Sequence, residues 1–290
     1  HVFQGVHMVV RFSVYHIVLM SVFLGTCIMV LGCWFVAKDW AIQRWRYVVS
    51  FLCCWCVCWC VWCWFGISSR QMVVGIDVGQ GDATLIIDGF KSILIDTGGV
   101  VRGKVVAENT VMPVLRYYGI NHLDMVVITH ADLDHVGGLN LLLEHYRVGQ
   151  VVSPTPLPPA GCYHAICDGS SVFKDGATSI TFNLPHGELQ LLSPSAVFPV
   201  ESVNDASLLT FLPLGAISMF LTGDISDTLE YQLVGAGYVP NADVFKLGHH
   251  GSRYASTGVL LDAVSPEFVW NSAGKNNLYG HPHPHTLSRL

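Results

Sequence analysis

The chain has 290 residues, of which 51% are hydrophobic and only 12% charged, and its formal net charge at pH 7 is −6. This composition is too apolar for an ordinary soluble protein, although the length allows one large domain or two smaller ones. Residues 1–69 carry a net positive charge and residues 70–290 a net negative one, which argues against tight, passive nucleic-acid binding by the second part.

The N-terminal part contains two stretches without any Asp, Glu, Lys or Arg, at residues 12–37 and 47–67. Both reach the roughly 20 apolar residues that span a bilayer as a helix, so they predict two transmembrane helices. A cleaved signal peptide fits poorly, because it would contain one shorter apolar region. Since the chain begins with His1 rather than Met, we expect residues 1–69 to end a truncated membrane channel that precedes a domain at 70–290.

The loop between these stretches predicts their orientation. It contains Lys38, Arg44 and Arg46 but a single acidic residue, Asp39. Basic residues in short loops tend to stay on the cytoplasmic side. We therefore expect everything after Ser68 to lie on the extracytoplasmic side.

Most of the ten cysteines fall within the two apolar stretches. The dense run at residues 53–60 is not expected to bind metal, because thiols on a lipid-facing helix behave as small hydrophobes. Whether Cys162 and Cys167 form a disulfide stays open, since the sequence does not decide it.

Residues 70–290 alternate short apolar runs with turn residues. The first half predicts strands at 72–78, 83–87, 92–95, 125–128 and 148–152, with helices at 108–118 and from just after 138 to about 146. The Asp88-Gly89 pair predicts a hairpin, and residues 153–170 predict a loop. The second half predicts strands at 178–183, 188–192, 207–212, 217–221, 244–247 and 268–271, with helices at 228–234 and 259–264. We expect one α/β domain in which two sheets pack together with helices outside.

His130-Ala-Asp132-Leu-Asp134-His135 follows the apolar run 125–128 directly. Two imidazoles and two carboxylates this close cannot all be buried unless a cation neutralises them. The sequence therefore predicts a metal site where a buried strand leaves the core. The alternative is a polar loop that happens to be rich in His and Asp.

Three more segments place ligand-type residues at strand ends: Asp96-Thr-Gly-Gly99, Thr222-Gly-Asp224 and His249-His250-Gly-Ser252. Each has an ordinary structural explanation on its own, most often a turn. Their joint order with the first cluster is far more specific, because ligands at several strand ends can converge on one edge of a sandwich.

In this order the segments resemble the metallo-β-lactamase superfamily. Asp77-Val-Gly-Gln-Gly-Asp82-Ala, His249-His-Gly-Ser and Tyr279-Gly-His281-Pro further resemble the C-terminal domain of ComEC-type DNA-uptake channel proteins. The resemblance covers about residues 70–290 and implies a metallo-β-lactamase-like αββα sandwich preceded by the two transmembrane helices. It also implies a bacterial inner-membrane protein that admits one strand of transforming DNA while this domain degrades the other.

The resemblance implies two metal sites. Carried over by position, the residues that would bind metal are His130, Asp132, Asp134, His135, Asp224, His249 and His250. His130 and Asp132 would serve one ion, Asp134 and His135 the other, and Asp224 both; which of His249 and His250 completes the second site stays open. Residues expected to support these ligands are Asp77, Asp82, Asp96, Asn204, Asp205 and Ser252.

The chain departs from the superfamily pattern at two places. Asp132 stands where a histidine is usual, and Asn204 or Asp205 stands where another is usual. Oxygen ligands shift the preference from Zn²⁺ towards Mn²⁺ or Mg²⁺, so we expect two divalent ions of one of these kinds. Such a pair can activate water and stabilise both oxygens of a phosphoryl displacement.

The residues expected to act on the substrate are Asp134, His135, Lys246 and His281. Lys246, His281, Asn276 or Asn277 would contact a phosphate or protonate the leaving group. For Lys246 the alternative is a side chain that simply faces solvent. His283 and His285 predict an exposed turn rather than metal ligands.

The resemblance implies a membrane-tethered phosphodiesterase, a DNase of the DNA-uptake machinery, with DNA, the membrane and other uptake proteins as partners. Two alternatives stay open. The same fold hydrolyses other esters, such as a phosphocholine ester or a lactone, and a catalytically silent domain would only bind or guide DNA.

Overall fold

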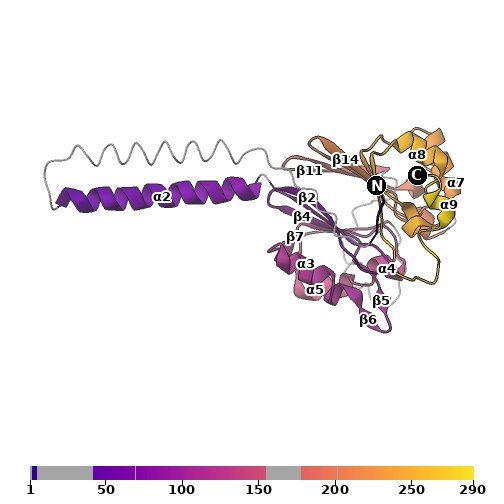
Figure 1. Cartoon of the computed structure of the whole chain (residues 1–290), viewed down its shortest axis with the longest axis horizontal. Helices are drawn as coiled ribbons and strands as arrows, with labels where there is room; N and C mark the ends of the chain where they lie inside the picture. The colour runs from indigo at the N-terminus through magenta and orange to yellow at the C-terminus, as the bar shows by residue number, and fades with distance from the viewer. Residues whose placement is uncertain (1, 5–41, 69, 155–177, 201) are drawn as a thin grey trace.

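The computed structural model describes residues 2–4, 42–68, 70–154, 178–200 and 202–290 (Figure 1). Two β-sheets form its centre. The larger sheet has the strand order β1-β16-β15-β14-β13-β12-β11, and the smaller has the order β10-β8-β4-β3-β2. Two short strand pairs, β5-β6 and β7-β9, lie outside these sheets.

The strands follow the predicted apolar runs closely. Those of the smaller sheet are β2 (Gln71–Gly75), β3 (Thr84–Asp88), β4 (Lys91–Ile95), β8 (Met125–Val127) and β10 (Val151–Val152). Those of the larger sheet are β1 (Val2–Gln4), β11 (Ser179–Leu184), β12 (Gly187–Leu192), β13 (Leu209–Leu214), β14 (Ile217–Leu221), β15 (Val244–Lys246) and β16 (Phe268–Asn271). The short pairs are β5 (Val100–Val101) with β6 (Lys104–Val105), and β7 (His122–Leu123) with β9 (Arg147–Val148).

The α-helices in the described ranges are α2 (Ile42–Ser68), α3 (Val111–Tyr117), α4 (Leu133–Val136), α5 (Leu139–His145), α7 (Asp227–Gly235), α8 (Gly258–Val264) and α9 (Pro284–Leu287). The 3₁₀ turns are η1 (Val106–Glu108), η2 (Pro194–Ala196), η3 (Asn204–Ala206) and η4 (Gly248–Gly251).

Three apolar cores separate four layers. Leu85 and Leu94 point from the smaller sheet towards a core that includes Leu115 of α3 and Leu142 of α5. Their neighbours along the same strands, such as Ile86, point the other way into a core shared with the larger sheet. A third core joins the outer face of the larger sheet to α7 and α8. Both sheets are thus covered on both faces, which explains why central strands such as β3 and β4 are near-continuous apolar runs. The predicted mixed α/β sandwich is confirmed.

The helix expected from just after 138 to about 146 is confirmed as α5, which begins at Leu139. The one-turn helix α4 inside the first cluster was not predicted. Gly137 and Gly138 separate α4 from α5, and a Cβ at Gly138 would overlap the carbonyl oxygen of Thr97 and the Cβ of Ala107. Close packing of this turn against the end of β4 therefore ends α4 after one turn. In contrast, the strand predicted at 148–152 is divided between β9 and β10.

The predicted span at 47–67 lies within α2, which projects away from the sandwich in Figure 1. Its large apolar side chains include Leu52, which is 52% exposed, and Val57, which is 60% exposed. Among the described residues, no helix meets the combined length and apolarity required to cross a membrane. The span predicted at 12–37 and the Cys162–Cys167 pair lie outside the described residues.

Candidate metal centre

The predicted ligands meet at the carboxyl ends of four strands. Asp96 directly follows β4, and His130 follows β8, which runs parallel to β4. Asp224 follows β14, and His249 and His250 follow β15, which runs parallel to β14. Because parallel strands end at the same edge, each sheet brings its polar residues to one place. Helix α4 adds Asp134 and His135 at the end of the sandwich away from α2 (Figure 1).

Asp224 lies at the centre of this cluster. Its Oδ2 is 3.3 Å from Nε2 of His250, 3.4 Å from Nε2 of His135 and 3.8 Å from Nε2 of His249. Asp134 Oδ2 lies 3.3 Å from the same Nε2 of His250. Asp82, His135, Asp224 and His250 are all buried and bring four ligand atoms within 4.8 Å of one another.

Three histidines have their rings fixed through Nδ1. That of His135 lies 2.8 Å from Asp96 Oδ2, that of His250 lies 3.0 Å from the carbonyl oxygen of Ser272, and that of His130 lies 3.1 Å from Thr129 Oγ1. The three opposite Nε2 atoms are buried without a hydrogen-bond partner, and so is Asp224 Oδ1. Metal-binding histidines are held in this way, with one nitrogen anchored and the other left for the ion. The donor set therefore fits a divalent cation.

The backbone is unusual at three residues of the cluster, namely the supporting residue Asp96 and the candidate ligands His249 and His250. Asp96, His249 and His250 have φ values of 58°, 49° and 55°, which is the left-handed region that non-glycine residues rarely adopt. Such conformations persist when surrounding contacts enforce them, and they concentrate at functional sites. Asp96 is held by Thr129, whose backbone N–H and Oγ1 donate to its two carboxylate oxygens at 2.8 and 2.7 Å.

The electrostatics of the centre favour a bound cation. Burial opposes charge on His135, but the carboxylates of Asp224 and Asp96 raise its pKa well above the usual value. The pKa of His250 is also raised well above its usual value, because Asp224 and Asp82 outweigh its burial. Burial would raise the pKa of Asp224, yet His135 and His250 hold it well below the usual value. In contrast, burial lowers the pKa of His130 to about 3, so that ring is neutral.

This charge pattern makes metal binding pH-dependent. The raised pKa values of His135 and His250 favour protonated rings in the metal-free site, whereas a bound ion requires their neutral nitrogens. We expect binding of Mn²⁺ at pH 7 to release about two protons, so that the apparent affinity rises roughly 100-fold per pH unit. Titration calorimetry in buffers of different ionisation enthalpy measures this release. Binding without proton release would show that both rings are neutral in the metal-free protein.

Lys246 and Asp82 form a buried ion pair at the edge of the cluster. The side chains are 3% and 5% exposed, and Nζ of Lys246 lies 2.5 Å from Oδ2 of Asp82. The solvent-facing alternative for Lys246 is therefore wrong. Asp82 Oδ1 is also 3.6 Å from Nδ1 of His250, so a residue expected only to support the ligands lies among them.

The other predicted ligands surround this group. Asp132 is half exposed, and its Oδ2 lies 3.8 Å from Nε2 of His130. His249 is 34% exposed at its side chain, whereas that of His250 is 2% exposed. His281 lies beside His249, with ring centroids 6.0 Å apart, and burial together with His249 and His250 lowers its pKa to about 4.

Several of the predicted supporting residues accept hydrogen bonds from backbone N–H groups near the cluster. Asp205 Oδ1 accepts a hydrogen bond from the N–H of Ser226 at 2.8 Å, which fixes the loop that carries Asp224. Asp77 is exposed and accepts from the N–H of Gly79. The Oγ of Ser252 accepts from the N–H of Tyr254 at 3.3 Å. The remaining predictions are placed as follows: Asn204 begins η3, Asn277 lies in the turn before His281, and His283 caps α9.

Glu230 is a positioning residue that the sequence did not reveal. It is fully buried on α7 and accepts hydrogen bonds from the N–H groups of Ser256 and Thr257 at 2.6 and 2.7 Å. Ser256 Oγ in turn accepts from the N–H of Gly248, so Glu230 holds the turn that carries His249 and His250. The only sequence signal for Glu230 was a carboxylate within the apolar pattern of the predicted helix 228–234. Its hydrogen-bond donors could not be predicted, because they lie 26 or more residues away along the chain.

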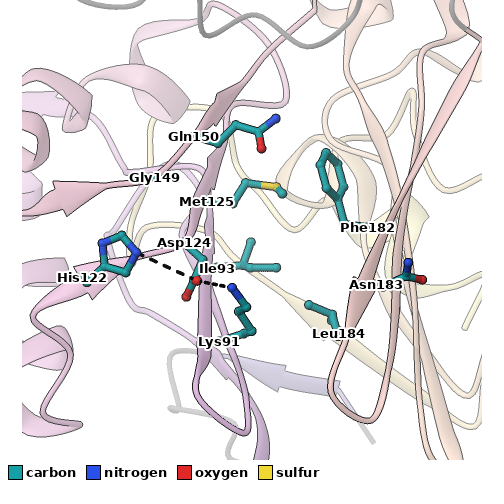
Figure 2. Close-up of a pocket in the computed structure, with 10 residues that line it drawn as sticks. All are labelled: Lys91, Ile93, His122, Asp124, Met125, Gly149, Gln150, Phe182, Asn183 and Leu184. Atoms are coloured by element: carbon teal, nitrogen blue, oxygen red, sulfur yellow. Dashed lines mark hydrogen bonds and ion pairs between the residues drawn. The ribbon is translucent and has the colours of Figure 1, made fainter.

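A cavity of about 360 Å³ opens at the other end of the strands (Figure 2). Lys91 and Asp124, paired at 2.7 Å, face Phe182 and Leu184 across it. It is lined by the beginnings of β4 and β8, whereas the metal-type ligands follow their carboxyl ends. The cavity is therefore separate from the candidate metal centre.

Comparisons with known proteins show what this chain is similar to. Residues 76–188 match the metallo-beta-lactamase superfamily. The chain is 32% identical to ComE operon protein 3 of Bacillus subtilis over 242 residues, which cover 77% of the chain and 31% of that protein. It is 32% identical to Recombination protein 2 of Haemophilus influenzae over 216 residues, which cover 74% of the chain and 26% of that protein. The chain thus spans less than a third of the length of these relatives.

Among solved structures, the metallo-beta-lactamase fold protein YhfI from Bacillus subtilis is similar, with a TM-score of 0.48 and 13% identity over 76% of this chain and 93% of that chain. Competence protein ComA of Neisseria gonorrhoeae is 33% identical over 220 residues, which cover 74% of the chain and 29% of that protein. Residues 76–188 are thus similar to the metallo-beta-lactamase superfamily, and about three quarters of the chain is homologous to part of ComE operon protein 3, Recombination protein 2 and Competence protein ComA.

Proposed function

We propose that residues 70–290 form a metal-dependent phosphodiesterase that cleaves DNA during DNA uptake. The observation that carries this proposal is the buried group of three imidazoles around Asp224, each anchored through Nδ1 and with an Nε2 atom that has no hydrogen-bond partner. The homologues supply the substrate class, because one of them is named a competence protein and another a recombination protein. Both names point to proteins that handle nucleic acid, and the ester bond of a nucleic acid is the phosphodiester.

We propose that the cluster holds two ions. His130 and Asp132 would hold one, and Asp134 and His135 the other, with Asp224 bound to both. We assign His250 rather than His249 to the second ion, because His250 is buried, anchored through Nδ1 and closer to Asp224. Bound divalent ions would supply positive charge to the phosphodiester and a water nucleophile near neutral pH.

The surrounding residues have distinct tasks in this proposal. Lys246 balances the charge of Asp82. Because its side chain is buried, we do not assign it the predicted contact with a substrate phosphate. His281 lies at the partly open side of the cluster and is neutral at pH 7, so it would accept a proton there rather than donate one. The numerous carboxylates favour Mn²⁺ or Mg²⁺, as their hard oxygen atoms suit these ions.

In the whole protein we propose that this domain works on the extracytoplasmic side of the bacterial inner membrane, degrading the strand that is not transported. The apolar stretches 12–37 and 47–67 would anchor it, and other DNA-uptake proteins would be its partners. Hydrolysis of a different ester does not account for these stretches. A silent DNA-guiding domain does not account for the complete set of ligands.

A cleavage assay tests this function. The full chain is stripped with a chelator, reloaded with Mn²⁺, Mg²⁺ or Zn²⁺, and mixed with end-labelled single- and double-stranded DNA. We expect no cleavage without metal and cleavage after reloading. Absence of cleavage with every ion would contradict the nuclease, and release of a lactone or choline product alone would support the other ester. DNA binding without turnover would support the silent domain.

A further inference from the structure

A row of aromatic rings leads from the surface to the metal cluster. Tyr279 is 68% exposed, and its ring stacks on His281 with centroids 5.6 Å apart and planes inclined by 28°. The ring of His281 lies 6.0 Å from that of His249, which lies 6.2 Å from that of His250. Since His250 belongs to the cluster, the exposed face of Tyr279 begins a continuous path of rings that ends at the metal ligands.

The loop that carries Tyr279 and His281 is held by hydrogen bonds to the side chain of Asn277. Its side-chain oxygen accepts hydrogen bonds from the N–H groups of Tyr279 and His281 at 3.1 and 3.0 Å. Its amide nitrogen donates to the carbonyl oxygens of Gly274 and His281 at 2.9 and 2.5 Å. The backbone on either side of Tyr279 is therefore fixed before any ligand arrives, which lowers the entropic cost of binding.

The loop is also fastened to the site at both ends. Ser272 Oγ donates to the carbonyl oxygen of Gly81 at 2.7 Å, beside Asp82 of the cluster. The N–H of His283 donates to the carbonyl oxygen of Gly251 at 2.8 Å, directly after His250. The position of Tyr279 relative to the metal ligands is consequently set by the fold.

An exposed ring supported from behind suits one kind of ligand in particular. Nucleobases stack on aromatic side chains, but only unpaired bases offer a free face, so such a ring selects single strands. Stacking also requires no positive surface, which matters in a segment whose net charge is negative. We propose that Tyr279, supported by His281, stacks on one unpaired base of a single-stranded nucleic acid whose neighbouring phosphodiester lies at the metal cluster. This inference rests on the proposed function.

The experiment compares oligonucleotides that carry one abasic site, moved one nucleotide at a time past the cleaved bond. With the full wild-type chain and Mn²⁺, we expect one position at which loss of the base lowers kcat/KM about tenfold, within the range for a base–aromatic stack. In Tyr279→Ala this position dependence should vanish, and in Tyr279→Phe it should persist. Tyr117→Ala removes a tyrosine of similar exposure from α3 and should keep the wild-type pattern.

A second readout does not depend on turnover. A 2-aminopurine base at the sensitive position should lose fluorescence on binding to wild type and to Tyr279→Phe, but not to Tyr279→Ala. Equal cleavage of intact and abasic strands by wild type at every position would overturn the stacking inference and leave the nuclease intact. Failure to cleave any strand would instead contradict the proposed function itself.

Discussion

Replacing Asp224 with asparagine is expected to remove bound metal and to lower DNA cleavage on the order of 1,000-fold, equivalent to about 4 kcal/mol of lost transition-state stabilisation. Asp224 is buried, and its Oδ2 lies within 3.8 Å of three imidazole nitrogens. An amide keeps the shape but removes the charge that both proposed ions share. Metal content by mass spectrometry and cleavage rates of labelled DNA measure the two effects.

The matched control is Asp227→Asn, three residues further along the same loop. Asp227 lies at the start of α7, and its Oδ1 accepts a hydrogen bond from the N–H of Thr228. This variant should retain both metal and activity. If Asp224→Asn also retained its metal and cleaved DNA at the wild-type rate, Asp224 would not be a ligand. Circular dichroism confirms that each variant is folded.

The second large effect concerns stability. Lys246→Met is expected to lower the free energy of unfolding of the metal-free protein by about 3–5 kcal/mol, the cost of leaving one member of a buried ion pair alone. Asp82 is 4% exposed, and its pKa is held down, against the effect of its burial, by Lys246 and then His250. Without Lys246 the carboxylate keeps only more distant cations. Urea unfolding in the presence of chelator measures the change.

Two further variants show whether the pair itself is responsible. Asp82→Asn combined with Lys246→Met removes both charges and should recover part of the lost stability, which gives a coupling free energy. Lys275→Met removes an exposed lysine and should change stability by about 0.5 kcal/mol or less. A loss below about 1 kcal/mol in Lys246→Met would mean that water, rather than Lys246, stabilises Asp82.

Much of the fold could be predicted from the sequence because its signals are local. The predicted strand 217–221 coincides with β14 and the predicted strand 268–271 with β16, since each is a short apolar run bounded by turn residues. The predicted helices at 228–234 and 259–264 correspond to α7 and α8 within one residue at each end. The one-turn helix α4 was not predictable, because the turn that follows it depends on Thr97 and Ala107 packing against Gly138.

The candidate site divides in the same way. The strand-end positions of His130, His135, Asp224 and the His249-His250 pair follow from sequence order, because parallel strands bring their carboxyl ends together. The proposed assignment of His250 rather than His249 as a ligand could not be predicted in this way. It depends on the hydrogen bond between His250 Nδ1 and the carbonyl oxygen of Ser272, 22 residues away.

By itself, the sequence determined which residue types stand at the strand ends, and with them the kind of chemistry that the domain carries. Only the tertiary structure decided which of these residues are buried together, that Asp82 joins them with Lys246 as its counter-charge, and that Glu230 holds the histidine turn. The physical reason is distance along the chain: apolar periodicity is a property of neighbouring residues, whereas charge balance in a buried site depends on groups that meet only after folding.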